Sequence, residues 1–319
     1  MSRYKFCVSI ASSILAPEWL EKFLKTTLET FEVATETGLI GAEIAGLDLT
    51  ETIDTATFSS IEYALYKHGV VVIRDNLLTP TQLAAFSRRF GPPQINVRAE
   101  ARNADTPEIF WISNLTKDGK PVGSHDAGRY WHSDLCYLET PSKVTLLNAI
   151  EVPERGGVVF GDTQFASAAA AYDALPNTMK KRLKGLKAAN SYRYMWNKKA
   201  HEFGLRPVLS QAELETRFPP DAIHPIVRTH PVNGRKCLYV CEGYTHAVIG
   251  SPKHESDTLL QKLFSHLADP TFHYRHQWCV GDLLMWDNCA VQHKATNDYE
   301  LPLRRLMQRC TIEGDEAVI

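Results

Sequence analysis

"GDLLMWDNCAVQH", Gly281 to His293, joins a short apolar run to a Gly-Asp turn that opens it. A run of this length beside turn residues is typical of a β-strand. Similar runs, rich in β-branched and aromatic residues, fill the chain from residue 109 onward, and Gly, Pro and Asn-Asp turns separate them. They are "IFWISN" (109–114), "KVTLLNAIEV" (143–152), "GGVVFGDTQF" (156–165), "PIVRTHP" (225–231) and "KCLYVCEGY" (236–244).

Two helical pieces, at residues 167–186 and 256–270, interrupt these runs. Because strands and helices do not alternate regularly, the order argues against a parallel α/β sheet. The pattern predicts a mainly β fold with flanking helices. We expect a double-sheet jelly roll, the cupin-like double-stranded β-helix, with helices packed on the outside.

The segment before these runs is more helical. Residues 38–49, "GLIGAEIAGLDL", predict a strand and its turn. Residues 55–69 have a Thr cap and helical apolar spacing, and the buried-strand run "VVVIRD" (70–75) follows them. Residues 79–91 repeat the pattern of a capped helix that ends at glycine.

The chain has 319 residues, 44% of them hydrophobic, so it can bury a full core. No repeat or low-complexity tract appears. We expect a helical N-terminal extension over residues 1–32 and a single jelly-roll domain with helical insertions over residues 33–319.

Charge and cysteine content restrict the partners and the compartment. The 35 basic and 37 acidic residues give a net charge of −2, which favours neither nucleic acid nor a membrane surface as a partner. The seven cysteines form no C-x-x-C pair, and this favours reduced thiols in the cytoplasm. The N-terminus resembles a weak signal peptide, but serines break its apolar core. A homo-oligomer remains open.

A histidine and a carboxylate lie two residues apart in "GRYWHSDLCY" (128–137), at His132 and Asp134. On a β-strand these side chains would share a face and could converge on one metal ion. Most His-x-Asp pairs are solvated surface or a local hydrogen bond. A third ligand is therefore needed, and His293 is the candidate, since two histidines and one carboxylate form the facial triad of non-heme iron(II) oxygenases.

Two arginines follow His293 in the β-like run "RRLMQRCTI" (304–312). On a strand Arg305 and Arg309 share a face, so both guanidinium groups would point into the barrel. Burying such a group is costly unless it meets an anion, and a carboxylate is its best partner. The alternative is a pair of surface arginines.

These segments resemble one family. "WHSD" (131–134), "GDTQF" (161–165) and "WDNCAVQHKATNDYELPLRRLMQRCTI" (286–312) are similar to the taurine dioxygenase and 2,4-dichlorophenoxyacetate dioxygenase family, whose members depend on iron(II) and 2-oxoglutarate. The resemblance extends from about residue 33 to residue 313.

The resemblance implies Fe(II), 2-oxoglutarate and O₂ as cofactors, with His132, Asp134 and His293 as iron ligands. It implies that Arg305 and Thr163 bind the distal carboxylate of 2-oxoglutarate. The family usually has "GGDT" where this chain has "GGVVFGDT", so the position of the threonine can differ.

Substrate residues also follow from the resemblance. Arg309 matches the arginine that faces an anionic substrate group in taurine-type members, although pairing with a remote carboxylate is the alternative. Where those members have a histidine, a tyrosine and an asparagine, this chain has Asn96, Ala99 and Gly128. These replacements predict a larger, less polar pocket and argue against taurine as the substrate.

The resemblance implies a dioxygenase that hydroxylates an unactivated C–H position of a small, anionic organic substrate and releases succinate and CO₂. Hydroxylation can lead to bond cleavage, and desaturation uses the same chemistry. Asp134 disfavours halogenation, because halogenases of this type leave that position to chloride. Two alternatives are another metal-dependent cupin-type enzyme, a hydrolase or isomerase, and a non-catalytic jelly-roll binding protein.

Other residues have simpler interpretations. Cys136 is expected to be a buried, inert thiol. His273 and His276 are expected on the surface. His125 and Arg129 precede "WHSD" and are candidates for a lid over the substrate.

Overall fold

The computed structural model describes residues 32–35, 39–96, 98–204, 206–315 and 318. The expected N-terminal extension, except for residue 32, lies outside these residues. Among the helices that are described, none is long and apolar enough to cross a membrane.

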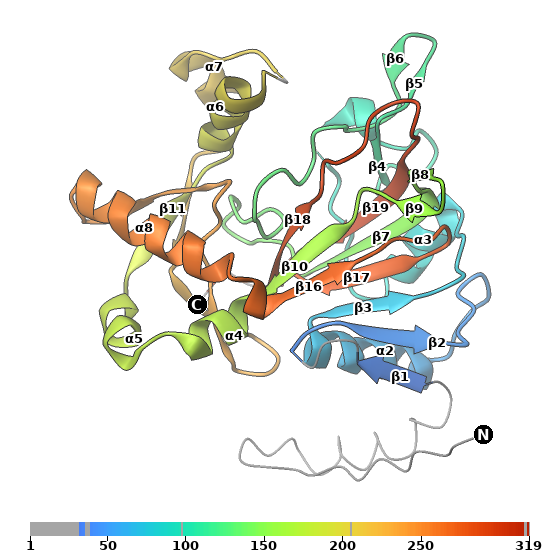
Figure 1. Cartoon of the computed structure of the whole chain (residues 1–319), viewed down its shortest axis with the longest axis horizontal. Coiled ribbons are helices and arrows are strands. Elements are labelled where there is room, and N and C mark those ends of the chain that lie inside the picture. The colour runs from blue at the N-terminus through green and yellow to red at the C-terminus, as the bar shows by residue number, and fades with distance from the viewer. Residues whose placement is uncertain (1–31, 36–38, 97, 205, 316–317, 319) are drawn as a thin grey trace.

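A seven-stranded sheet is the centre of the molecule (Figure 1). Neighbouring strands run antiparallel, except for β2 and β3, which are parallel. In sheet order the strands are β1 (Glu32–Thr35), β2 (Ala42–Ala45), β3 (Val70–Ile73), β17 (Leu283–Asp287), β7 (Val144–Glu151), β19 (Leu306–Ile312) and β4 (Phe110–Ser113).

A smaller antiparallel sheet completes the jelly roll, with β10 (Thr163–Ser167) between β16 (His273–His276) and β18 (Val291–Ala295). Apolar side chains of both sheets form one buried cluster. Leu147, Trp286 and Met307 come from the large sheet, and Phe165 and Val291 from the small one. The expected double-stranded β-helix is therefore confirmed.

Helices cover the other face of the large sheet. α2 (Thr55–His68) and α3 (Pro80–Ser87) supply Ile61 and Leu83 to a second core with Leu146 and Met285 of the sheet. The cap of α2 is Asp54 rather than the expected threonine, since its carboxylate accepts a hydrogen bond from the Thr57 N–H. The predicted Thr79 cap of α3 is confirmed, but α3 ends before Gly91.

A lobe of helices and a small sheet lies beside the jelly roll (Figure 1), and parts of it share an apolar cluster with Trp131 and with Ala166 of β10. Its helices are α4 (Ala168–Ala174), α5 (Asn177–Leu183), α6 (Tyr192–Phe203), α7 (Gln211–Arg217) and α8 (Lys253–Leu267). Its sheet has the order β12 (Ala222–Pro225), β11 (Lys187–Asn190), β15 (Thr245–Val248). The remaining short elements are η1 (Ala99–Ala101), η2 (Pro270–Phe272) and the hairpins β5 (Thr116–Lys117)/β6 (Lys120–Pro121), β8 (Glu154–Arg155)/β9 (Val158–Val159) and β13 (Val227–Thr229)/β14 (Lys236–Leu238).

Candidate metal centre

The first two candidate ligands lie in an irregular segment rather than on the expected strand. Asp134 is in a turn, and the next residue, Leu135, has a φ of 56°. His132 forms an isolated antiparallel bridge with His293 of β18, and the two residues exchange backbone hydrogen bonds of 3.1 and 2.8 Å. This bridge places side chains that are 161 residues apart in the sequence next to each other.

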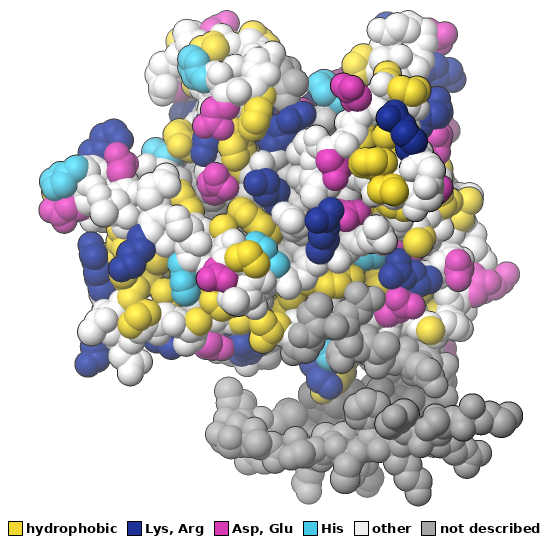
Figure 2. Space-filling view, in the orientation of Figure 1, with side chains coloured by type: hydrophobic (Ala, Val, Ile, Leu, Met, Phe, Trp, Pro, Cys, Tyr) yellow, Lys and Arg dark blue, Asp and Glu magenta, His cyan; other side chains and the backbone are white. Residues whose placement is uncertain are grey.

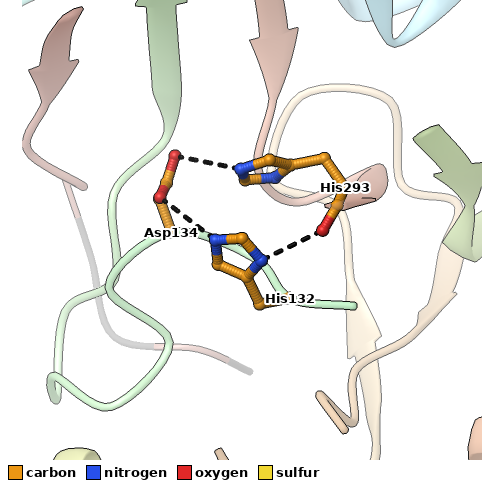
Figure 3. Close-up of side chains that lie close together, drawn as sticks. All are labelled: His132, Asp134 and His293. Atoms are coloured by element: carbon orange, nitrogen blue, oxygen red, sulfur yellow. Dashed lines mark hydrogen bonds and ion pairs between the residues drawn. The ribbon is translucent and has the colours of Figure 1, made fainter. Parts of the chain in front are cut away.

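The three side chains converge as expected (Figure 3). The Nε2 atom of His132 lies 3.8 Å from Asp134 Oδ1, and Nε2 of His293 lies 3.9 Å from Asp134 Oδ2. One potential ligand atom from each residue lies within 4.8 Å of the others. All three residues are buried, with exposed fractions of 6–8%. Within the described residues, no other group of three His, Cys, Asp or Glu side chains meets this criterion.

Hydrogen bonds orient two of these side chains. Nδ1 of His132 lies 2.9 Å from the Tyr130 carbonyl and 3.0 Å from the His293 carbonyl. Because carbonyls only accept, Nδ1 carries the proton and Nε2 presents a lone pair toward Asp134. Thr145 Oγ1 donates to Asp134 Oδ2 at 2.8 Å, while the Asp134 N–H donates to Asn288 Oδ1 at 3.1 Å.

The protonation states suit a metal ion. Burial would raise the pKa of Asp134, but His293, Arg309 and His132 outweigh it and lower this pKa to about 2. Burial lowers the pKa of His293 to about 3, and it also lowers the pKa of His132. The site therefore offers one carboxylate and two neutral imidazoles at neutral pH, the forms that ligate metals.

Arg305 is buried and Arg309 is half-buried, so neither is the surface arginine of the alternative. Arg305 is 4% exposed and directly precedes β19. Its Nη2 donates to the Gly161 carbonyl at 3.4 Å, but its buried Nε has no hydrogen-bond partner. A Cβ atom on Gly161 would lie 3.3 Å from that Nε and 3.0 Å from the Tyr299 ring. Glycine thus permits the close approach of this loop to the guanidinium group.

Thr163 begins β10, two residues after Gly161, and pairs with Ala295, two residues after His293. Since alternate residues of a strand share a face, Thr163 and His293 lie on the same face of the small sheet. Its Oγ1 accepts a hydrogen bond from Trp278 Nε1 at 3.1 Å. The hydroxyl proton is therefore free for another acceptor.

Arg309 lies on β19, opposite Leu147 of β7. Its Nη1 is 3.4 Å from Asp134 Oδ1, so it pairs with a carboxylate remote in sequence, which is itself a candidate ligand. Its Nε is buried and has no partner. One side of this guanidinium therefore still lacks an acceptor.

A pocket adjoins the metal centre, and its lining includes His132, Asp134 and Arg309. The predicted substrate residues Asn96 and Gly128 also line it. No feature of the sequence indicated the other lining residues, three of which are cationic. The missed residues include Arg98, Lys199, Arg206, Tyr192 and Tyr244.

The remaining expectations have mixed outcomes. Cys136 is fully buried and its pKa is raised by burial, as expected of an inert thiol. The surface assignment of His276 is wrong, because it is 1% exposed and its Nε2 lies 3.0 Å from Asp282 Oδ2. His273 is half-buried. Arg129 stacks over Phe203 of α6, with its Cζ 5.0 Å from the ring centroid.

Comparison with known proteins agrees with this geometry. Residues 31–311 match the family model described as "Taurine catabolism dioxygenase TauD, TfdA family". The chain is 34% identical over 290 residues to the alpha-ketoglutarate-dependent 2,4-dichlorophenoxyacetate dioxygenase of Cupriavidus pinatubonensis, covering 88% of this chain and 96% of the relative. It is 31% identical to the (S)-phenoxypropionate/alpha-ketoglutarate-dioxygenase of Sphingobium herbicidovorans, covering 90% of this chain and 96% of that relative.

A solved structure is also similar. The crystal structure of AAD-2 in complex with Mn(II) and N-oxalylglycine superposes with a TM-score of 0.77 at 30% identity, covering 91% of this chain and 99% of that one.

Proposed function

This chain belongs to the TauD, TfdA family of dioxygenases, and from that premise we propose that it oxidises a small anionic organic compound at an unactivated C–H position. It is an oxidoreductase that uses Fe(II), 2-oxoglutarate and O₂. The observation that carries the proposal is the buried cluster of His132, Asp134 and His293 beside a pocket with unsatisfied guanidinium groups.

The donor set fits iron. His132 and His293 would supply neutral Nε2 atoms and Asp134 would supply the single anionic ligand, which leaves positions open for other groups. Iron(II) with 2-oxoglutarate supplies the oxidising chemistry, in which succinate and CO₂ are released. The chain's own residues orient the ligands, through Thr145 and the carbonyls around His132, and bury the site away from water.

For 2-oxoglutarate, we assign Arg305 and Thr163 to the distal carboxylate. Arg305 supports this role because it is buried with an unpartnered Nε and no carboxylate partner among the described residues. Such a group favours a charge-assisted contact with an incoming anion. Thr163, two residues from the loop that Arg305 contacts, has a hydroxyl proton to donate.

For the substrate, we assign Arg309 to an anionic group, and Asn96 and Gly128 to the pocket wall. The unpartnered Nε of Arg309 supports this role, and so does the chemistry of the relatives, because the names phenoxyacetate and phenoxypropionate denote carboxylates. Gly128 has a φ of 72°, and a Cβ atom there would lie 3.1 Å from Ala295 Cβ. A side chain at this position would strain the backbone beside the pocket.

We further propose a single oxygenase domain over residues 33–319, which the continuous family match supports. The odd number of cysteines and the lack of a C-x-x-C pair support a reducing compartment such as the cytoplasm. The relatives' functions disfavour the hydrolase, isomerase and binding-protein alternatives.

Anaerobic titration of the protein with Fe(II) and 2-oxoglutarate tests this function. We expect the weak visible charge-transfer band of the iron chelate, and succinate release that rises when a substrate is supplied. In Asp134→Ala the band should be lost and iron binding weakened, because only two neutral ligands remain. Near-normal turnover in Asp134→Ala, or no band with the wild-type protein, would contradict the proposal.

A further inference from the structure

The pocket beside the metal centre has more positive charge than the cofactors need. Besides Arg309, its lining includes Arg98, Lys199 and Arg206. Figure 2 shows Lys and Arg side chains along the hollow beside the lobe that contains α6 and α7. A buried cation is costly unless it has a counter-charge, so the acidic partners of each cation matter.

Two of these cations already have acidic partners. Asp126 is buried, and its carboxylate contacts the Arg206 guanidinium and lies 3.5 Å from Arg98 Nη1. Arg98 also pairs with Glu100 at 2.9 Å. The two arginines and the two carboxylates therefore balance, although Nη1 of Arg206 is buried without a partner.

Lys199 differs from them. It lies on α6, is 6% exposed, and donates its Nζ proton to the backbone carbonyl of Asp126 at 2.6 Å. It makes no ion pair with a carboxylate among the described residues. Burial lowers the pKa of this amine to about 7, and the charges of Arg129 and Arg98 add to the effect. The ammonium form thus lacks a counter-charge.

The charges of the loaded site can be counted. Iron(II), the Asp134 carboxylate and the two carboxylates of 2-oxoglutarate sum to one negative charge, which Arg305 balances. Arg309 and the protonated form of Lys199 are then left, two positive charges that line one pocket, and an anion bound beside Lys199 would favour that protonated form. A substrate with one anionic group would leave one of them uncompensated.

We propose that the substrate carries two anionic groups, the first bound by Arg309 and the second by Lys199 together with the free Nη1 edge of Arg206. Tyr137, Tyr192 and Tyr244 line the same pocket and suit an apolar body that links the two groups. This inference rests on the proposed function and adds the substrate class, an organic dianion.

Binding calorimetry on the anaerobic enzyme, loaded with Fe(II) and saturating 2-oxoglutarate, tests the inference. The probes are adipate, pimelate and suberate, compared with hexanoate, heptanoate and octanoate. We expect the best-fitting dicarboxylate to bind about tenfold more tightly than the monocarboxylate of equal length, the effect of one charge-assisted contact. Varying the length allows for the unknown spacing of the two groups.

In Lys199→Met this preference should fall to about twofold or less, with affinity for the monocarboxylates and for 2-oxoglutarate unchanged. Lys198→Met is the matched control, because Lys198 neighbours Lys199 on α6 but does not line this pocket, and it should keep the preference. Arg206→Gln provides a second variant if Lys199→Met fails to fold, and it should reduce the preference.

A wild-type enzyme that does not prefer dicarboxylates, whether it binds both series equally or neither, overturns the inference. So does a Lys199→Met variant that retains the preference. The visible band of the iron chelate, recorded on the same samples, tests the proposed function separately, so that failure of one is distinguishable from failure of the other.

Discussion

Thr145 Oγ1 donates a 2.8 Å hydrogen bond to Asp134 Oδ2 from the middle of the large sheet. The same hydroxyl accepts a hydrogen bond from Asn288 Nδ2 at 2.9 Å. Asn288 in turn accepts from the Asp134 N–H through its Oδ1 atom. A fully buried threonine on a rigid strand thus fixes the rotamer of a carboxylate that lies in a turn.

We expect Thr145→Val to weaken Fe(II) binding about tenfold, because partners that orient metal ligands affect metal affinity by this order. Metal titration in the absence of 2-oxoglutarate measures it. Thr311→Val is a suitable control, since Thr311 is the cross-strand neighbour of Thr145 and makes no hydrogen bond to Asp134. Equal metal affinity in the two variants would show that Thr145 does not position Asp134.

Arg305→Leu should raise the KM for 2-oxoglutarate about tenfold or more, because it removes a desolvated charge-assisted contact. The affinity for Fe(II) should change little. Arg304→Leu is the matched control, as Arg304 is exposed and pairs with Glu151 at 2.6 Å. An unchanged KM in Arg305→Leu would remove this residue from the cosubstrate site.

Arg309→Met should raise the substrate KM about tenfold or more and leave 2-oxoglutarate affinity unchanged. Steady-state kinetics with each compound varied in turn separates the two effects. Arg309 also contacts Asp134, so iron binding is measured in parallel. A neutral or cationic substrate, or normal substrate binding by the variant, would show that Arg309 only supports the ligand carboxylate.

Stability should fall as the pH falls from about 6.5 to 4, and His68 contributes to this fall. Burial lowers the pKa of His68 from 6.5 to about 4, and the charge of Lys67 adds to the effect. Between these two pH values His68 binds a proton in the unfolded chain but not in the folded chain. The free energy of unfolding therefore decreases as the pH falls. Above pH 6.5 His68 is neutral in both the folded and the unfolded chain, so it no longer lowers the free energy of unfolding.

Urea unfolding at pH 7 and pH 4.5 measures this effect. In His68→Gln the difference between the two pH values should be smaller, because one histidine with a lowered pKa is gone. His254→Gln, at a side chain that is 82% exposed, should leave the difference unchanged. A His68→Gln variant with the wild-type difference would assign the pH dependence to other groups.

The jelly roll could be predicted because short apolar runs are local features of the sequence, and the three ligands because the segments around them resemble one family. The conformation of the first two ligands could not. A His-x-Asp pair predicts a β-strand. In the structure only His132 forms a backbone bridge, with His293, and Asp134 lies in the turn that follows. That bridge is a long-range contact that no local pattern encodes.

The buried polar residues that were missed share one physical reason. A lysine on a helix is usually solvated, whereas Lys199 is buried with its Nζ atom bonded to the Asp126 carbonyl. Likewise, His276 resembles a surface histidine until the Gly-Asp turn brings Asp282 to 3.0 Å. In both cases the partner comes from another element, and the sequence alone does not pair them.

The backbone bridge between His132 and His293 also has a consequence for biosynthesis. During translation His132 leaves the ribosome 161 residues before His293. His132 and Asp134 cannot form the complete cluster until β18 has paired with the His132 segment. Iron therefore cannot serve as an early template for folding. The complete three-ligand site forms only after the chain has been made as far as β18 and this strand has paired with the segment of His132.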